Sequence, residues 1–120
     1  MEFVGLLSSG KGTWGQVIGL IKREKWEKII LIGDSYAKRT FSSLGLEKDV
    51  DFMEINLEKG IKELIEDLKK KLKPKISGTE VALSIASGSG KEHMALISAL
   101  LNLPVGIKFA VLTKEGALLI

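Results

Sequence analysis

The stretch KIILIG, residues 28–33, is a nearly unbroken apolar run that is followed directly by Asp34. A continuous run of this kind suits a parallel strand that is buried on both faces, whereas a half-exposed strand alternates apolar and polar residues. Strand-sized apolar runs recur at residues 3–7, 80–86 and 107–113. Segments with helical periodicity lie between most of these runs, and this alternation predicts parallel strands that are joined by crossover helices.

The remaining segments complete the predicted architecture. The helix-period segments are expected at Trp14 to Ile21, around 36–44, at 61–72 and at 94–103; an edge strand is expected at 50–55 and a closing hairpin at 107–120. Because crossovers between parallel strands are right-handed, the economical topology is a doubly wound sheet. We therefore predict an α/β, Rossmann-like three-layer sandwich with a mainly parallel sheet of order 3-2-1-4-5 and a C-terminal antiparallel hairpin strand. In this order strands one and four meet at a crevice, the usual ligand site of open α/β sheets.

Length and composition narrow the classes of function. The 120 residues fit one domain, residues 1–120, and the net charge of +3 suits an anionic ligand but does not favour duplex nucleic acid. There is no cysteine and a single histidine, His93, so we expect neither a disulfide nor a metal site, and no cofactor. No apolar stretch has the length of a membrane span or the form of a secretory leader, and we expect a cytoplasmic protein. The composition, rich in Lys and Glu, is typical of thermophilic sources.

The loop SSGKGTWG, residues 8–15, nearly matches a P-loop. Gly5, Gly10 and Lys11 have the spacing of the motif, but Gly12 stands where a magnesium-binding Ser or Thr is needed. Gly5 also falls inside the apolar strand instead of at its end. The sequence therefore disfavours a nucleoside triphosphatase.

The same loop also matches a dinucleotide-binding fingerprint. Gly10, Gly12 and Gly15 follow a strand and open a helix, and Asp34 lies about 20 residues further on, where an acidic residue binds a ribose hydroxyl. This pattern predicts a subunit that binds NAD or NADP, and 120 residues leave no room for a substrate domain. Asp34 has a second interpretation as the N-cap of the next helix.

A second small-residue loop, SGSGK at 87–91, follows the fourth strand. Backbone N–H groups at a helix start, together with Ser hydroxyls and the Lys91 ammonium, form an anion site. The predicted strand order places this loop beside loop 8–15, and two such loops indicate more than one phosphate.

The segments WEKIILIGDS and LSIASGSGKEHMALISALL, together with the small-residue loop after the first strand, resemble the CARF (CRISPR-associated Rossmann fold) domains. The resemblance covers nearly the whole chain. It implies a homodimeric sensor that binds a cyclic oligoadenylate across the two-fold axis. The ligand-binding candidates are Ser8, Ser9, Gly10, Lys11, Gly12, Thr13, Asp34, Ser87, Gly88, Ser89, Gly90 and Lys91.

The sequence leaves catalysis and partners open. If the domain also cleaves its ligand, we expect a metal-independent attack by a ribose 2′-hydroxyl, with Lys11 and Lys91 neutralising the developing charge and His93 as a candidate proton carrier. The apolar helix at 94–103 favours a homodimer, because such a helix needs partners on more than one side. The alternatives are the dinucleotide-binding subunit and a non-catalytic interaction module.

Overall fold

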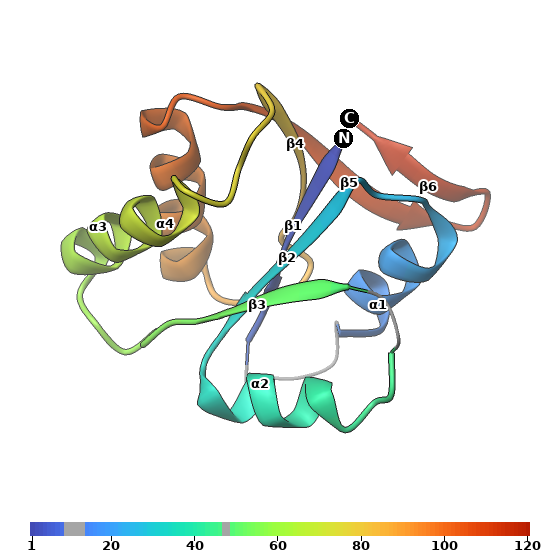
Figure 1. Ribbon diagram of the computed structural model, residues 1–120, viewed down its shortest axis with the longest axis horizontal. Coiled ribbons are helices and arrows are strands. Elements are labelled where there is room, and N and C mark those ends of the chain that lie inside the picture. The colour runs from blue at the N-terminus through green and yellow to red at the C-terminus, as the bar shows by residue number, and fades with distance from the viewer. Residues whose placement is uncertain (9–13, 47–48) are drawn as a thin grey trace.

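The computed structural model describes residues 1–8, 14–46 and 49–120 (Figure 1). In chain order the elements are β1 (Glu2–Leu7), α1 (Trp14–Arg23), β2 (Lys28–Gly33), α2 (Ser35–Ser42), β3 (Val50–Glu54), α3 (Ile61–Leu72), β4 (Glu80–Ser84), α4 (Gly90–Asn102), β5 (Gly106–Thr113) and β6 (Gly116–Leu119). Among the ligand-binding candidates, Ser9, Gly10, Lys11, Gly12 and Thr13 lie outside the described residues.

The strands form one six-stranded sheet of order β3-β2-β1-β4-β5-β6. Neighbours are parallel from β3 to β5, and β6 pairs with β5 antiparallel at the edge. In the middle of the sheet Val4 lies between Ile30 on β2 and Leu83 on β4. The predicted α/β class, the order 3-2-1-4-5 and the antiparallel C-terminal strand are confirmed, with β6 added as the sixth strand.

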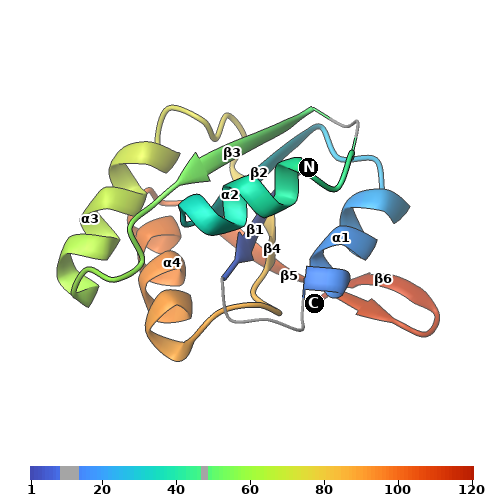
Figure 2. The same cartoon turned by 90° about the horizontal axis from the view of Figure 1, so that it is seen from below.

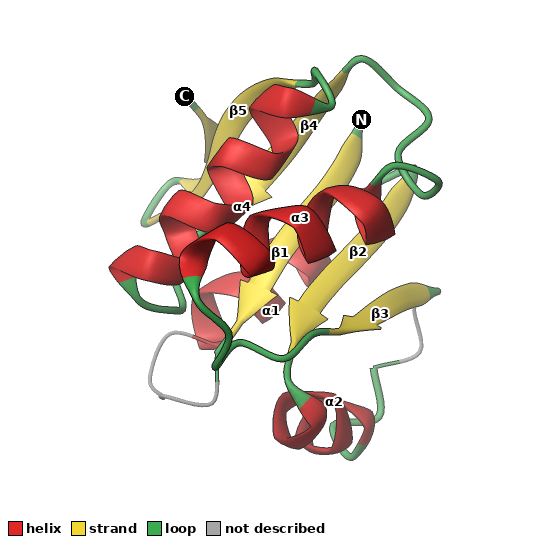
Figure 3. Cartoon of the chain, turned by 90° about the vertical axis from the view of Figure 1, so that its left-hand side faces the viewer, coloured by secondary structure: helices red, strands yellow, loops and turns green. Residues whose placement is uncertain are grey.

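Helices cover both faces of the sheet. One core cluster joins α1 and α2 to residues such as Phe3 and Leu31, and the other joins α3 and α4 to residues such as Val4 and Ile30. Figure 2 shows α3 and α4 on one side of the strands and α1 on the other, and Figure 3 shows α3 and α4 in front of the sheet. KIILIG supplies side chains to both clusters, as a doubly buried strand must.

Helix α1 also packs against the C-terminal hairpin. A Cβ atom added at Gly19 would lie 2.6 Å from Leu112 Cδ2, so the helix backbone lies close to this side chain of β5. A Cβ atom added at Gly15 would meet nothing within 4 Å among the described residues.

Two predicted boundaries were wrong. Strand β4 ends at Ser84 and not at residue 86, and α4 begins at Gly90 and not at Met94. The helix begins early because a capping box forms between Ser89 and Glu92. Within the described residues no helix is both long and apolar enough to cross a bilayer.

Candidate functional site

Ser8, which follows β1, meets Ser87 of the loop after β4 at the carboxyl ends of these two strands. The backbone N–H of Ser8 donates to the Ser87 Oγ at 3.0 Å. Ser87 is buried, and the Trp14 indole N–H fixes the same corner by donating to the Ser8 carbonyl at 2.7 Å. The structure therefore brings Ser8 and Ser87 together at the predicted crevice, and it gives Trp14 an anchoring role.

Ser89 and Glu92 cap the start of α4. The Ser89 Oγ accepts from the Glu92 backbone N–H at 3.3 Å, and the Glu92 Oε1 accepts from the Ser89 backbone N–H at 2.8 Å. The carboxylate also offsets the positive end of the helix dipole. Two of the backbone amides in the first four helical residues therefore have partners. The Glu92 amide donates to the Ser89 hydroxyl, and the His93 amide donates to the Ser89 carbonyl at 2.9 Å.

The amides of Gly90 and Lys91 are not taken by the capping box or by the helix. Gly90 is exposed, and a Cβ added there would meet nothing within 4 Å among the described residues. Within the part of the chain that the structure describes, these two N–H groups have no partner and are open to water or an anion.

Gly88 has a structural reason to be glycine. Its φ is +108°, and an added Cβ would overlap the Leu6 Cδ2 atom and lie 2.9 Å from Glu92 Oε1. The backbone at Gly88 thus lies directly on the buried side chain at the end of β1, and this contact fixes the height of the loop above the sheet.

The Lys91 side chain connects the loop to the segment after β3. Its ammonium donates to the Lys59 carbonyl at 2.8 Å. The Lys59 ammonium in turn pairs with Asp67 on α3 at 2.8 Å. The hydrogen bond and charge of Asp67 raise the pKa of Lys59, and the same hydrogen bond holds the pKa of Asp67 below its ordinary value.

His93 does not form a nucleophile–base pair with the nearby serine. Its Nε2 lies 2.8 Å from the backbone carbonyl of Ser87, so in the neutral ring the proton is on Nε2 and the acceptor lone pair is on Nδ1. The Ser87 hydroxyl faces Ser8 instead. Within the described residues there is also no group of three or more His, Asp or Glu side chains that could hold a metal ion.

Asp34 lies at the carboxyl end of β2, next to β1 in the sheet. It is the N-cap of α2, and its Oδ1 accepts from the Ala37 backbone N–H at 2.8 Å. Asp34 therefore has the capping role that the sequence offered as the alternative to ribose binding.

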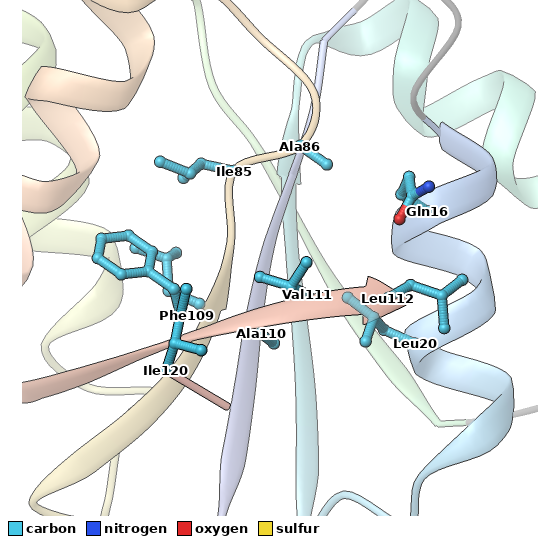
Figure 4. Close-up of a pocket in the computed structure, with 10 residues that line it drawn as sticks. Gln16, Leu20, Ile85, Ala86, Phe109, Ala110, Val111, Leu112 and Ile120 are labelled. Carbon is cyan, nitrogen blue, oxygen red and sulfur yellow. The ribbon is translucent and has the colours of Figure 1, made fainter. Parts of the chain in front are cut away.

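A cavity of about 390 Å³ adjoins this site and was missed by the sequence analysis (Figure 4). It lies between α1, the two residues that follow β4, and the second half of β5. Among the described residues that line it, which include Ile85, Ala86 and Val111, Gln16 is the only one with a polar side chain. In the sequence Ile85 and Ala86 are apolar, and apolar residues directly after a strand predict that the strand continues.

No family model matches this chain, and no curated protein matches it. The fold and the site define a Rossmann-like α/β structure in which Ser8, after β1, and Ser87, after β4, meet at the point where the strand order reverses.

Proposed function

We propose that this chain is a nucleotide-binding sensor that binds a cyclic oligoadenylate across a homodimer. The observation that carries the proposal is the hydrogen bond from the Ser8 amide to the Ser87 hydroxyl, which joins the two loops at the topological switch point. In open α/β sheets this is where ligands bind.

The start of α4 has the chemistry that a phosphate needs. The free amides of Gly90 and Lys91 point out of the positive end of a helix of 13 residues. Lys91 belongs to the same first turn, its ammonium lies on the Lys59 carbonyl, and the chain carries a net charge of +3. An anionic ligand on this loop would therefore gain hydrogen bonds and charge neutralisation together.

The outer surface of α4 supports the homodimer. Met94 and Leu101 are 63% and 60% exposed and lie seven residues apart, which places them on the same side of the helix. The buried side of α4 packs on the sheet through residues such as Leu96 and Leu100. Because α4 begins at the loop 87–91, a two-fold contact along this helix would bring the loops of two copies close to one ligand.

Ring cleavage is an extension of the proposal. The ribose 2′-oxygen would bond to the adjacent phosphorus while the bond from phosphorus to the 5′-oxygen breaks, which leaves a 2′,3′-cyclic phosphate and a 5′-hydroxyl. The 2′-hydroxyl loses a proton and the 5′-oxygen gains one. Lys91 would neutralise the developing charge, and the Nδ1 lone pair of His93 would carry the proton.

Isothermal titration of the purified chain with cyclic tetra-adenylate and cyclic hexa-adenylate tests the proposal, followed by chromatography of the spent ligand. We expect one ligand per dimer, and an affinity that falls at least tenfold in Lys91→Ala. Lys62→Ala is the matched control, because Lys62 is exposed and lies in the first turn of the neighbouring helix α3. No binding of either ring, or equal losses in both variants, would refute the proposal.

Dinucleotide binding is the second candidate function, because Asp34 stands at the end of β2, where a ribose-binding carboxylate belongs. The informative variant is Asp34→Ser, since Ser preserves the cap of α2 but shortens the side chain and removes its charge. NAD binding by the wild type that is lost in Asp34→Ser and kept in Lys91→Ala would establish this function instead.

A further inference from the structure

The cavity beside the candidate site opens where β5 leaves β4. The ladder between the two strands ends with Leu83 opposite Phe109, and β4 itself ends at Ser84. Strand β5 continues to Thr113 with β6 as its only described strand neighbour. Figure 4 shows the second half of β5 crossing below Ile85 and Ala86, with Gln16 facing them from α1.

The backbone of β5 turns a hydrogen-bonding edge toward this opening. Phe109 exchanges both backbone hydrogen bonds with Ile120, each at 2.9 Å, on the β6 side. Successive residues of a strand direct their N–H and C=O groups to opposite edges. Ala110 and Leu112 therefore direct theirs to the β4 side, where Gly106 donates to the Thr79 carbonyl at 2.8 Å.

The Ala110 carbonyl and the Leu112 amide extend past the last residue pair of the β4–β5 ladder. Both residues line the cavity, together with Ile85 and Ala86, which continue the chain beyond β4. The cavity thus combines apolar walls with one backbone acceptor and one backbone donor, two residues apart.

We infer that this cavity is a subsite for a nucleobase, which stacks between the apolar walls while its hydrogen-bonding edge is read by the Ala110 carbonyl and the Leu112 amide. This rests on the proposed function, which places the phosphate at the loop 87–91. Adenine presents an amino donor next to a ring acceptor, and the two β5 groups match that pair. A hydrocarbon chain would fill the walls but leave both backbone groups without a partner.

Size and position fit a single nucleoside. The volume of about 390 Å³ lies in the lower part of the range of small-ligand pockets, about 300–1,000 Å³. Ile85 is two residues before Ser87, a separation of at most about 7 Å along an extended chain. A phosphate on the loop and a base in the cavity can therefore belong to one nucleotide, with Gln16 at the rim to contact its edge or sugar.

The first test compares adenosine 5′-monophosphate, N6,N6-dimethyladenosine 5′-monophosphate and ribose 5-phosphate by titration, beside cyclic tetra-adenylate. We expect the adenosine compound to bind at least tenfold more tightly than ribose 5-phosphate, and the dimethyl compound, which lacks the amino donor, to lose most of that gain. In ¹⁵N-labelled protein, the Leu112 amide resonance should shift with adenosine 5′-monophosphate and stay in place with ribose 5-phosphate.

The second test blocks the cavity. Ala86 is exposed and lines it, so Ala86→Trp fills the space without disturbing the core. The control is Leu44→Trp, at an apolar side chain that is 46% exposed and does not line the cavity. We expect Ala86→Trp to reduce the affinity for adenosine 5′-monophosphate to that of ribose 5-phosphate, and Leu44→Trp to leave it unchanged.

The outcomes separate the two proposals. If cyclic tetra-adenylate binds but Ala86→Trp has no effect, or the Leu112 amide does not respond, the nucleobase subsite is wrong and the sensor function stands. If no nucleotide or phosphate compound binds the wild type, both fail. A guanosine compound that binds as well as the adenosine one, with the same Leu112 shift, keeps the subsite and refutes its match to adenine.

Discussion

The substitution Gly88→Ala tests whether the second loop is held by the fold before any ligand arrives. Gly88 has a φ of +108°, a region that an L side chain rarely adopts. Its added methyl would also overlap Leu6 Cδ2 and press on the Glu92 carboxylate at 2.9 Å. Leu6 is 1% exposed, in the core beneath α4, and so has little room to move away.

The expected loss follows from these two effects. Holding a non-glycine residue at such a φ costs about 1–3 kcal/mol, and overpacking a buried site costs about 1–3 kcal/mol. The free energy of unfolding should therefore fall by about 2–6 kcal/mol, a large part of the about 5–15 kcal/mol that a domain has. Movement of the loop away from Leu6 would lower the loss, but it would disturb the bond of Ser87 to the Ser8 amide.

The assay is chemical unfolding followed by circular dichroism, with Gly90→Ala as the matched control. Gly90 is the first residue of α4 and an added methyl there meets nothing within 4 Å, so alanine should raise stability by up to about 1 kcal/mol. A Gly88→Ala protein as stable as the wild type, with its Ser8 and Ser87 resonances unmoved, would refute this account of the loop.

Three further predictions concern the rest of the structure. Burial raises the pKa of the Glu2 carboxyl, but hydrogen bonds from the Gly78 and Ser77 amides outweigh it and hold the pKa below its ordinary 4.5. Glu2→Gln should therefore lower the free energy of unfolding by about 1–3 kcal/mol near pH 7, and by progressively less as the pH falls through the folded-state pKa of Glu2. Urea unfolding of both proteins at about pH 7 and about pH 3 measures this difference. A difference that is the same at both pH values would contradict the lowered pKa of Glu2. Ser84→Ala should raise the unfolding free energy by about 1 kcal/mol, because the buried Oγ has no partner among the described residues; a fall would reveal one. Leu101→Glu should convert the proposed dimer to a monomer in light scattering while the unfolding free energy of the fold changes by less than about 0.5 kcal/mol, and an unchanged mass would move the interface away from α4.

The fold could be predicted because its decisive signals are local. Residues 29–32 are all apolar and contribute to both helical layers, a pattern that is typical of a central parallel strand. The boundaries were less accurate for a physical reason. Ile85 and Ala86 are as apolar as a strand residue but line a cavity, and an apolar pattern does not distinguish the two environments. The early start of α4 was readable, because Ser89 and Glu92 have capping-box spacing.

The sequence predicted the location of the candidate site but not the contacts of its side chains. The strand order predicted that loop 8–15 lies beside loop 87–91, and within the described residues Ser8 contacts Ser87. The role of each side chain depends on tertiary contacts that a local sequence pattern does not show. Lys91 donates to the carbonyl of Lys59, which is 32 residues away in the chain, and His93 contacts the carbonyl of Ser87 and not its hydroxyl. The cavity combines residues of α1, β4 and β5, so its existence depends on where two strands separate.

In the loop 87–91, the atoms that stabilise the fold differ from those that would bind the proposed ligand. The fold uses the Ser87 and Ser89 hydroxyls and the Glu92 carboxylate, and leaves the amides of Gly90 and Lys91 for an anion. The Lys91 ammonium would have two competing partners, because it already donates to the Lys59 carbonyl at 2.8 Å and would also bind the proposed phosphate. A hydrogen bond from an ammonium to a phosphate joins two opposite charges, whereas the Lys59 carbonyl is a neutral acceptor, so the bond to phosphate is the stronger of the two. A bound phosphate should therefore attract the ammonium and release the Lys59 carbonyl.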